Sequence, residues 1–394
     1  MPKTVYLGMS GGVDSSVSAL LLKQQGYHVV GVYMKNWSKD LPGMKCPWAE
    51  DLADAKRVAV KLDLDFEVWD FEEAYKKKVV DYMLAEFKKG NTPNPDIMCN
   101  QEIKFRLFYD EAMKRGADFI ATGHYANVRK MKSSFEGVRL GLAPRSAPEK
   151  ESFHFSLCKA ADENKDQTYF LYRMPQDALV HTLFPIGEML KPDVKKLAEQ
   201  NGLHNAYKKE SMGVCFVGEV GMKDFLKEYI DVQPGEIREL ETEQVLGYHE
   251  GAIFYTIGQR HGLYIGGGLP YYVVKKDLDH NIIYVSKNLN AADLWTSELE
   301  LKDVFVREGE ILFSSSVTRR ESLRDSRVAL RLYSSEKSIS PSLQVRLRHR
   351  APLIPAKFDG TKVIFGKPIK RVAPGQSVVF YDGEICLGGG IVAA

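Results

Sequence analysis

Residues 4–16, TVYLGMSGGVDSS, decide how this chain is expected to fold. Thr4–Met9 is a short apolar run that predicts a buried strand, and Val13–Gly26 has an apolar side at helical spacing and ends on a glycine. Between them, Gly11 and Gly12 let the backbone turn tightly and approach a ligand without interference from Cβ atoms. Freed N–H groups at the positive end of a helix favour a phosphate.

Strands and helices alternate through the following hundred residues. The further expected strands are 28–34, 66–69 and 118–122, and the expected helices are 48–62, 71–89 and 102–115. Strands separated by helices of this length predict parallel βαβ units and a doubly wound α/β sheet. An isolated glycine pair is usually a plain turn, but the first βα crossover is the usual ligand edge of such a sheet.

The second half of the chain has a different texture. Helical pattern returns at 167–173 and 192–201, and β-rich runs follow at 270–275, 281–286, 377–381 and 384–387, the last two around an Asp-Gly turn. Residues 133–152 and 314–340 are expected to be loops. We therefore expect an α/β domain over 1–218, a small central domain over 219–286 with part of 182–204, and an all-β barrel over 287–394.

Composition excludes several classes of protein. Hydrophobic residues make up 44% of the 394 and charged residues 27%, which is typical of globular chains and not of disorder or coiled coil. No run approaches about 18 consecutive apolar residues, so no membrane-spanning helix is expected. Five thinly spread cysteines form no disulfide framework and no CxxC metal motif, so a functional cysteine is expected to act as a thiol.

Positive charge is concentrated near the C-terminus. Residues 301–394 hold 16 Lys and Arg against 9 Asp and Glu, which is compatible with a nucleic-acid phosphate partner. Arg346, Arg348 and Arg350 alternate along 344–350, so on a strand they would share one face. Such a face is either a solvated edge strand or a stripe of phosphate contacts, and the charge balance favours the phosphate contacts.

The glycine-rich loop matches neither GxGxxG nor the Walker sequence. SGGVDSS resembles the pyrophosphate loop of ATP pyrophosphatases, which split ATP between its α and β phosphates and adenylate a substrate. Further motifs narrow the resemblance. They are YMKNW at 33–37, TPNPDIMCN at 92–100, EIKF at 102–105, ATGHYA at 121–126, KDQTYFL at 165–171, ESMGVCFVG at 210–218, YTIGQR at 255–260 and APGQS at 373–377. In this order they resemble the tRNA-specific 2-thiouridylase family over nearly the whole chain, apart from 131–160 and 308–340.

The resemblance implies that ATP adenylates the C2 oxygen of the wobble uridine in the tRNA anticodon stem-loop. The residues expected to bind ATP are Gly8, Met9, Ser10, Gly11, Gly12, Val13, Asp14, Ser15, Met34 and Gly123. Mg²⁺ is expected with the pyrophosphate, although no spacing marks a metal ligand.

Sulfur delivery would then need a thiolate or a persulfide. By the resemblance, Cys215 receives a persulfide from a cysteine desulfurase or a sulfur-relay carrier, Cys99 is its partner thiol, and Asp96 is a general acid or base. Both cysteines follow residues typical of exposed loops. The remaining cysteines, Cys46, Cys158 and Cys386, are expected to be small buried hydrophobes. An iron–sulfur cluster on Asp96, Cys99 and Cys215 stays open as an alternative, although the spacing of three scattered ligands does not support it.

The resemblance also implies contacts with tRNA. These are Asn94, Pro95, Asp96, His124, Lys165, Asp166, Gln167, Arg348, His349 and Gln376. Without it, His124 is typical of a packed strand end and 165–167 of a helix start. Position 349 is usually aromatic in bacterial members, so the histidine is a departure. The target uridine is expected to be splayed out of its loop into the pocket.

Two rival functions remain open from the residues alone. Another adenylating enzyme of the same superfamily, such as a lysidine synthase or an amide-forming synthetase, would not need the paired cysteines. A tRNA-binding protein with a vestigial nucleotide site would not release pyrophosphate. We expect a monomer in the bacterial cytoplasm, with the mitochondrial matrix as the alternative.

Overall fold

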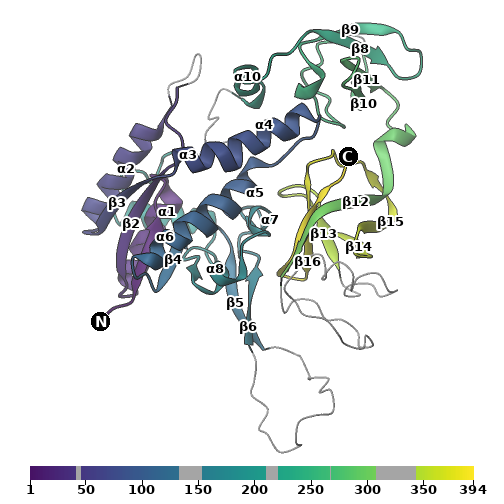
Figure 1. Ribbon diagram of the computed structural model, residues 1–394. Coiled ribbons are helices and arrows are strands. Elements are labelled where there is room, and N and C mark those ends of the chain that lie inside the picture. Colours follow the sequence, from purple (N-terminus) through teal and green to yellow (C-terminus); the bar gives the residue numbers. More distant parts are fainter. Residues whose placement is uncertain (41–45, 133–152, 210–220, 267, 308–342) are drawn as a thin grey trace, which may run out of the picture.

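The computed structural model describes residues 1–40, 46–132, 153–209, 221–266, 268–307 and 343–394. An α/β domain, a small central domain and a β-barrel follow one another along the chain (Figure 1). This confirms the expected fold class. The expected loops at 133–152 and 314–340 lie outside the described residues. Within the described ranges, no helix is long and apolar enough to cross a membrane.

The α/β domain is built on a five-stranded parallel sheet. Its order is β3 (Asp65–Asp70), β2 (His28–Lys35), β1 (Thr4–Gly8), β4 (Phe119–Thr122) and β7 (Thr182–Leu183). β1 pairs with β2 on one side and with β4 on the other, so the order of strands reverses at β1. Ligands of open α/β sheets bind at the carboxyl ends of the strands beside such a switch point. The phosphate loop follows β1, and Gly123 follows β4.

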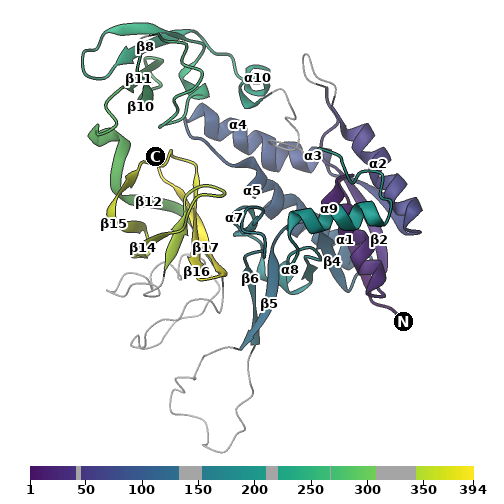
Figure 2. The same ribbon diagram turned by 180° about the vertical axis from the view of Figure 1, so that it is seen from behind.

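Helices cover both faces of this sheet (Figure 2). One face packs against α1 (Val13–Gln24), α2 (Trp48–Lys61) and α9 (Lys191–Gln200). The other packs against the helical run of α5 (Pro95–Cys99), the π-helical η2 (Asn100–Phe108) and α6 (Tyr109–Lys114). Short helices α7 (Thr168–Leu171) and α8 (Gln176–Val180) complete this side. The sheet is therefore buried on both faces, as its continuous apolar strands predict.

Two expected helices differ from the structure. The first, 71–89, is a contiguous run of α3 (Glu72–Tyr75), π-helical η1 (Lys76–Val80) and α4 (Asp81–Lys88). The second, 102–115, begins seven residues earlier, at Pro95. Asn94 caps it, since its Oδ1 accepts hydrogen bonds from the backbone N–H groups of Asp96 at 3.1 Å and Ile97 at 3.4 Å. Proline is favoured at the first helical position, so residues 94–96 form the start of this helix.

The central domain is a small sheet with its own apolar core. It contains α10 (Met222–Lys227), η3 (Ala252–Phe254) and the strands β8 (Gly235–Glu239), β9 (Val245–His249), β10 (Tyr272–Asp277) and β11 (Ile282–Ser286). The strand order is β10-β11-β8-β9, and the β11–β8 pair is parallel. Figure 1 shows this domain above both of the others.

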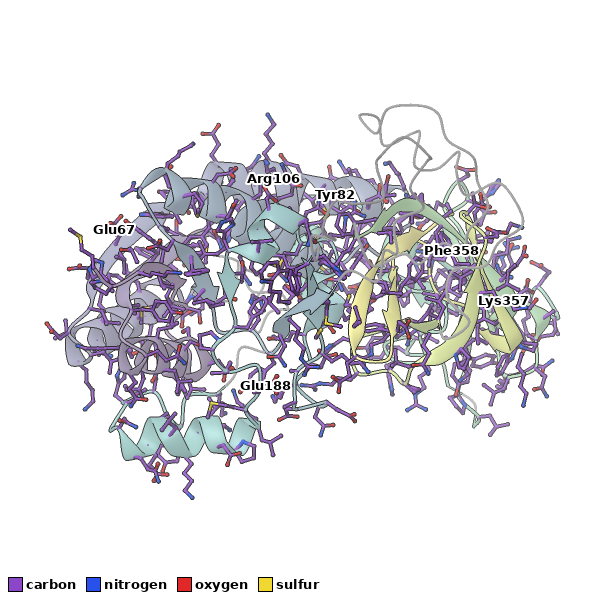
Figure 3. All side chains as sticks on the ribbon, turned by 90° about the horizontal axis from the view of Figure 1, so that it is seen from below. Glu67, Tyr82, Arg106, Glu188, Lys357 and Phe358 are labelled. Carbon is purple, nitrogen blue, oxygen red and sulfur yellow. The ribbon has the colours of Figure 1, made fainter. Side chains whose placement is uncertain are left out.

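The C-terminal strands close into a six-stranded β-barrel. After η4 (Ala292–Leu294), the barrel joins β12 (Trp295–Val306), β15 (Lys362–Lys370), β14 (Ile354–Phe358), β13 (Gln344–Arg346), β16 (Ser377–Asp382) and β17 (Ile385–Val392), which pairs back with β12. In β14, Phe358 is buried within the barrel while its neighbour Lys357 points outward (Figure 3). The hairpin of β5 (Asn127–Lys132) and β6 (Phe153–Cys158) extends from the α/β domain and pairs with β17. The barrel is thus joined to the α/β domain through a shared sheet.

Candidate functional site

The phosphate loop is held in one conformation by its own side chains. Gly12 has an extended backbone and is the residue before α1. The hydroxyls of Ser15 and Ser16 both donate to its carbonyl oxygen, at 3.0 and 2.9 Å. Gly11 has a φ of +76°, and a Cβ on it would lie 2.3 Å from the carbonyl oxygen of Asp51. Only glycine fits there, and the unpaired N–H groups of the first turn of α1 lie at this loop.

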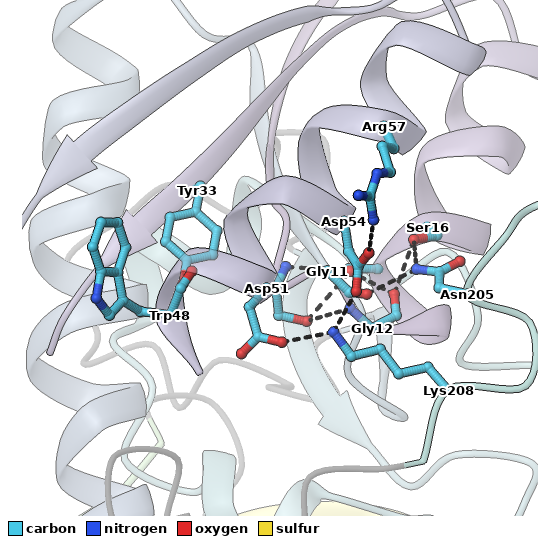
Figure 4. Close-up of polar contacts among 12 residues, drawn as sticks. Gly11, Gly12, Ser16, Tyr33, Trp48, Asp51, Asp54, Arg57, Asn205 and Lys208 are labelled. Atoms are coloured by element: carbon cyan, nitrogen blue, oxygen red, sulfur yellow. Dashed lines mark hydrogen bonds and ion pairs between the residues drawn. The ribbon is translucent and has the colours of Figure 1, made fainter. Parts of the chain in front are cut away.

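Polar contacts from behind fasten the loop to its neighbours (Figure 4). The Asn205 amide donates to the carbonyl oxygen of Gly11 at 2.8 Å. Lys208 makes ion pairs with Asp51 at 2.7 Å and Asp54 at 2.6 Å, so α2 is tied to the chain that follows α9. Burial opposes ionisation of Asp54, but hydrogen bonds from Lys208 and His204 outweigh it and lower the pKa of that carboxyl. This network therefore favours the charged form of Asp54.

Asp14 is supported by a buried cation. Its carboxylate pairs with Lys191 Nζ at 2.7 Å and accepts a hydrogen bond from the Tyr125 hydroxyl at 3.0 Å. The Lys191 side chain is only 8% exposed, so the pair is shielded from water. Asp14 therefore links α1 to α9 and to the end of β4.

A cavity of about 420 Å³ opens in front of the loop. Nine of the ten residues expected to bind ATP line it, and Gly11 is the exception. A Cβ on Gly123 would lie 2.6 Å from the backbone nitrogen of Ser15, so this glycine keeps the space beside α1 open. The volume of the cavity lies within the range of about 300–1,000 Å³ that is usual for small-molecule sites. The cradle therefore fits a nucleotide.

Part of the cavity lining is not among the residues predicted from the sequence. The additional lining residues are Tyr33, Asn36, Trp37, Cys46, Pro47, Trp48, Asp51, Lys104, Thr122, Lys208 and Lys209. Five of them, Tyr33, Asn36, Trp37, Lys104 and Thr122, lie within the quoted motifs, which was the available signal. Pro47 to Asp51 and Lys208 carry no local signal, because they reach the cavity only through the packing of α2.

The helix α5 presents two of the expected catalytic residues. Asp96 is half-buried, and burial raises the pKa of its carboxyl while the charge of Lys104 opposes the rise. Cys99 is only 3% exposed and packs in one apolar cluster with Trp37 and Cys46. The expectation that Cys99 lies on an exposed loop is therefore wrong, because the Asn94 cap starts a helix that carries Cys99 inward.

The remaining cysteines divide into two groups. Cys46, Cys158 and Cys386 are buried, as expected, and Cys46 also lines the cavity. Cys215 and the whole 210–218 motif lie outside the described residues. Among the residues that are described, no three His, Cys, Asp or Glu side chains are arranged to hold a metal ion.

Comparisons with known proteins agree over nearly the full length of the chain. Residues 3–219 match the family model described as tRNA methyl transferase HUP domain, 223–287 its PRC-barrel domain and 328–392 an aminomethyltransferase beta-barrel domain. A tRNA-specific 2-thiouridylase from Listeria monocytogenes serotype 4a is 43% identical over 390 residues, which cover 98% of this chain and 94% of the relative. The chain belongs to the tRNA-specific 2-thiouridylase family. A relative of the same name from Geobacillus kaustophilus is 42% identical, covering 99% of this chain and 95% of its own.

The predicted tRNA contacts of this 2-thiouridylase family member fall into different environments. His124 and Gln167 line the nucleotide cavity, and burial lowers the pKa of His124 well below its usual value. Asp166, by contrast, is fully buried and pairs with Arg346 at 2.6 Å. Its carboxylate is enclosed between the α/β domain and the barrel, and the contact of Asp166 with tRNA stays a prediction. Lys165 beside it is half-buried, and its contact stays a prediction.

The prediction that Arg346, Arg348 and Arg350 share one face of a strand is wrong. β13 ends at Arg346, whose side chain is 10% exposed, while Arg348 and Arg350 are exposed in the turn that follows. Arg350 has a φ of +62°, so the backbone has left the strand and the three arginines do not share a face. His349 packs on Phe170 with ring centroids 4.6 Å apart. Burial, aided by the charge of Arg350, lowers the pKa of His349 to about 4, which keeps the ring neutral at pH 7.

Gln376 lies at a junction of the three domains. Its Nε2 donates to the carbonyl oxygen of Thr92 at 2.6 Å, and the backbone N–H of Thr92 donates to the carbonyl oxygen of Pro374 at 2.8 Å. Thr256 of the central domain lies 3.2 Å from Thr92, hydroxyl to hydroxyl. The segment that leads into Asn94 is thus held from both smaller domains. The contacts of Asn94, Pro95 and Gln376 with tRNA stay predictions.

Proposed function

We propose that this chain replaces the C2 oxygen of the tRNA wobble uridine with sulfur, in a reaction driven by ATP. The observation that carries the proposal is one continuous helical run. α5 bears Asp96 and Cys99, and η2 directly after it brings Lys104 to the wall of the nucleotide cavity. The helix that carries a carboxyl with a raised pKa and a thiol is therefore continuous with the element that lines a cavity fit for ATP.

The first step activates the base. The uridine C2 oxygen attacks the α-phosphorus of ATP, the bond to the bridging oxygen breaks, and pyrophosphate leaves with that electron pair. The loop from Gly8 to Ser15 would hold the phosphates at the start of α1, and Met34 and Gly123 would border the adenosine. Asp96 would take the N3 proton of the uridine, since it lies in the first turn of α5, two residues after the Asn94 cap, and its raised pKa suits a group that gains and loses a proton.

The second step delivers sulfur. The terminal sulfur of a Cys215 persulfide attacks C2 and AMP leaves, which joins the base to Cys215 through a disulfide bond. The Cys99 thiolate then attacks the Cys215 sulfur, which forms a Cys99–Cys215 disulfide and releases 2-thiouridine as its anion. The anion takes back its N3 proton from Asp96. An external thiol reductant restores both thiols. The alternative is that Cys99 frees hydrogen sulfide first, and that this attacks C2.

The partners follow from the reaction. A desulfurase or a sulfur-relay carrier would load Cys215, and Mg²⁺ would accompany the triphosphate. Exposed Arg348 and the neutral His349 on Phe170 would contact the RNA from the barrel. Because the relatives are bacterial proteins, we place the reaction in the bacterial cytoplasm, with a single chain as the working unit.

The test is sulfur transfer from radiolabelled cysteine to unmodified tRNA, with ATP, Mg²⁺ and a cysteine desulfurase. Thionucleosides are resolved on a mercury gel for the wild type, Cys99→Ser, Cys215→Ser and the matched control Cys158→Ser. Label is expected in wild type and control and absent from the other two. Pyrophosphate release without sulfur incorporation would favour another adenylating enzyme, and no pyrophosphate at all would favour a binding protein.

A further inference from the structure

Lys104 is the feature of the cavity that the reaction scheme leaves unused. It lies on η2, five residues after Cys99, and its side chain lines the nucleotide cavity. Among the described residues, no carboxylate lies within ion-pair distance of its ammonium, whereas Lys208 in the same wall is held by Asp51 and Asp54. A half-buried ammonium without a counter-ion is costly unless an anion joins it.

Its neighbours fix this ammonium toward the cavity. Nζ lies 3.4 Å from His124 Nε2. An ammonium only donates, so Nε2 must accept, and the ring proton then lies on Nδ1 and points to the Thr122 hydroxyl at 2.8 Å. Burial first, and the charge of Lys104 second, lower the pKa of His124, so the ring stays neutral and leaves the charge of Lys104 uncancelled. The charge of Lys104 also acts on Asp96, where it opposes the rise in pKa that burial causes.

The position of Lys104 selects one phosphate. The phosphate loop and the start of α1 hold one side of the cavity, and these N–H groups suit the departing pyrophosphate. Lys104 arrives from η2, on the opposite face of the sheet and directly after the helix that carries Asp96. The phosphate between pyrophosphate and the target base is the α-phosphate.

We propose that Lys104 is a catalytic residue that binds the non-bridging oxygens of the α-phosphate while AMP moves to the uridine oxygen. This rests on the proposed function. Negative charge on these oxygens changes as the new oxygen–phosphorus bond forms and the bond to pyrophosphate breaks, and a fixed cation there stabilises that transition state. Lys104 exchanges no proton in this step. The N3 proton still passes to Asp96.

The experiment measures tRNA-dependent pyrophosphate release for wild type, Lys104→Met, Lys104→Arg and the control Lys114→Met, an exposed lysine further along the same helical run. Removing one such electrostatic group costs about 10²–10³-fold in kcat. We expect that loss in Lys104→Met, with partial rescue in Lys104→Arg and wild-type kinetics in the control. The affinity for tRNA should be unchanged, and circular dichroism should report intact helices.

The pH profile separates the proposal from an indirect role. If Lys104 acted only by lowering the pKa of Asp96, the Lys104→Met enzyme would recover wild-type rates at higher pH. That recovery, or wild-type kcat at pH 7.5 in Lys104→Met, would overturn the proposal. A wild-type enzyme without tRNA-dependent pyrophosphate release would instead overturn the proposed function. If Lys104→Met does not fold, Lys104→Arg and Lys104→Gln give the same contrast.

Discussion

Replacing Arg346 by methionine should lower the stability of the protein without changing the number of its contacts with RNA phosphates. Arg346 Nη1 and Asp166 Oδ2 lie 2.6 Å apart, and their side chains are 10% and 0% exposed. Asp166 also accepts hydrogen bonds from the backbone and hydroxyl of Thr168, so its lone pairs are satisfied within the protein. Breaking a buried pair by removing one partner costs about 3–5 kcal/mol, because the other charge stays buried.

The magnitude is checked by urea denaturation and a double-mutant cycle. Arg346→Met should lower the free energy of unfolding by about 3–5 kcal/mol, and Asp166→Asn should restore part of that loss when added to it. A loss below about 1 kcal/mol, the size of an exposed ion pair, would refute the reasoning. So would two substitutions whose costs simply add.

The same variant tests the RNA side of the argument. A lysine or arginine that contacts a phosphate contributes about one unit to the slope of log affinity against log salt. Arg346→Met should leave the tRNA slope unchanged. Arg348→Met, in the exposed turn two residues further on, should flatten it by about one. A flattened slope in Arg346→Met would mean that Arg346 faces the RNA after all.

Three further perturbations have definite outcomes. Gly123→Val should reduce ATP affinity by at least about a hundredfold in calorimetry, because its Cβ would lie 2.6 Å from the loop backbone, and unchanged binding would contradict that steric reading. Gln376→Leu removes one hydrogen bond to Thr92, worth about 1 kcal/mol, so kcat should fall several-fold at unchanged tRNA affinity, whereas a pure RNA contact would weaken affinity instead. Burial lowers the pKa of Lys276 to about 8 from its ordinary 10.5. Between pH 8 and 10.5 the unfolded chain therefore binds more protons at Lys276 than the folded chain does, so the free energy of unfolding of the wild type should rise with pH across this range. Lys276→Met should lack this rise, which urea titrations at pH 8 and pH 10.5 would measure.

Local sequence pattern was sufficient to predict the strands and helices that position the site. The apolar run before Gly11, the helical spacing after it and the repeated alternation define the sheet, since each is a property of ten to fifteen neighbouring residues. The start of α5 was less visible, although its signal is local too. Asn94 followed by proline is a capped helix start, but the same residues are equally typical of a turn.

Charges were harder to place than elements, because the partner of a charge is not local. Asp166 and Arg346 are 180 residues apart, so nothing near either one shows that they neutralise each other. Lys208 and Asp51 meet across 157 residues in the same way. A basic run near the C-terminus therefore indicated an RNA surface, while the fold assigns one of its arginines to the domain interface. Periodicity shows which face is apolar, and only the three-dimensional fold shows which polar groups are already paired.

The segment that leads into α5 is held by hydrogen bonds from both smaller domains. Lys276 of the central domain donates to the carbonyl oxygen of Gly90 at 2.5 Å, and Gln376 of the barrel donates to that of Thr92 at 2.6 Å. Asn94 then caps α5. The segment 90–94 therefore has little conformational freedom, because two of its carbonyl groups and the Asn94 side chain are all hydrogen-bonded. A shift of either smaller domain must move the first turn of α5 or break one of these bonds. The domains that would grip RNA are therefore the ones that hold the segment leading to Asp96, and we expect a change in either of them to affect base activation as well as tRNA binding.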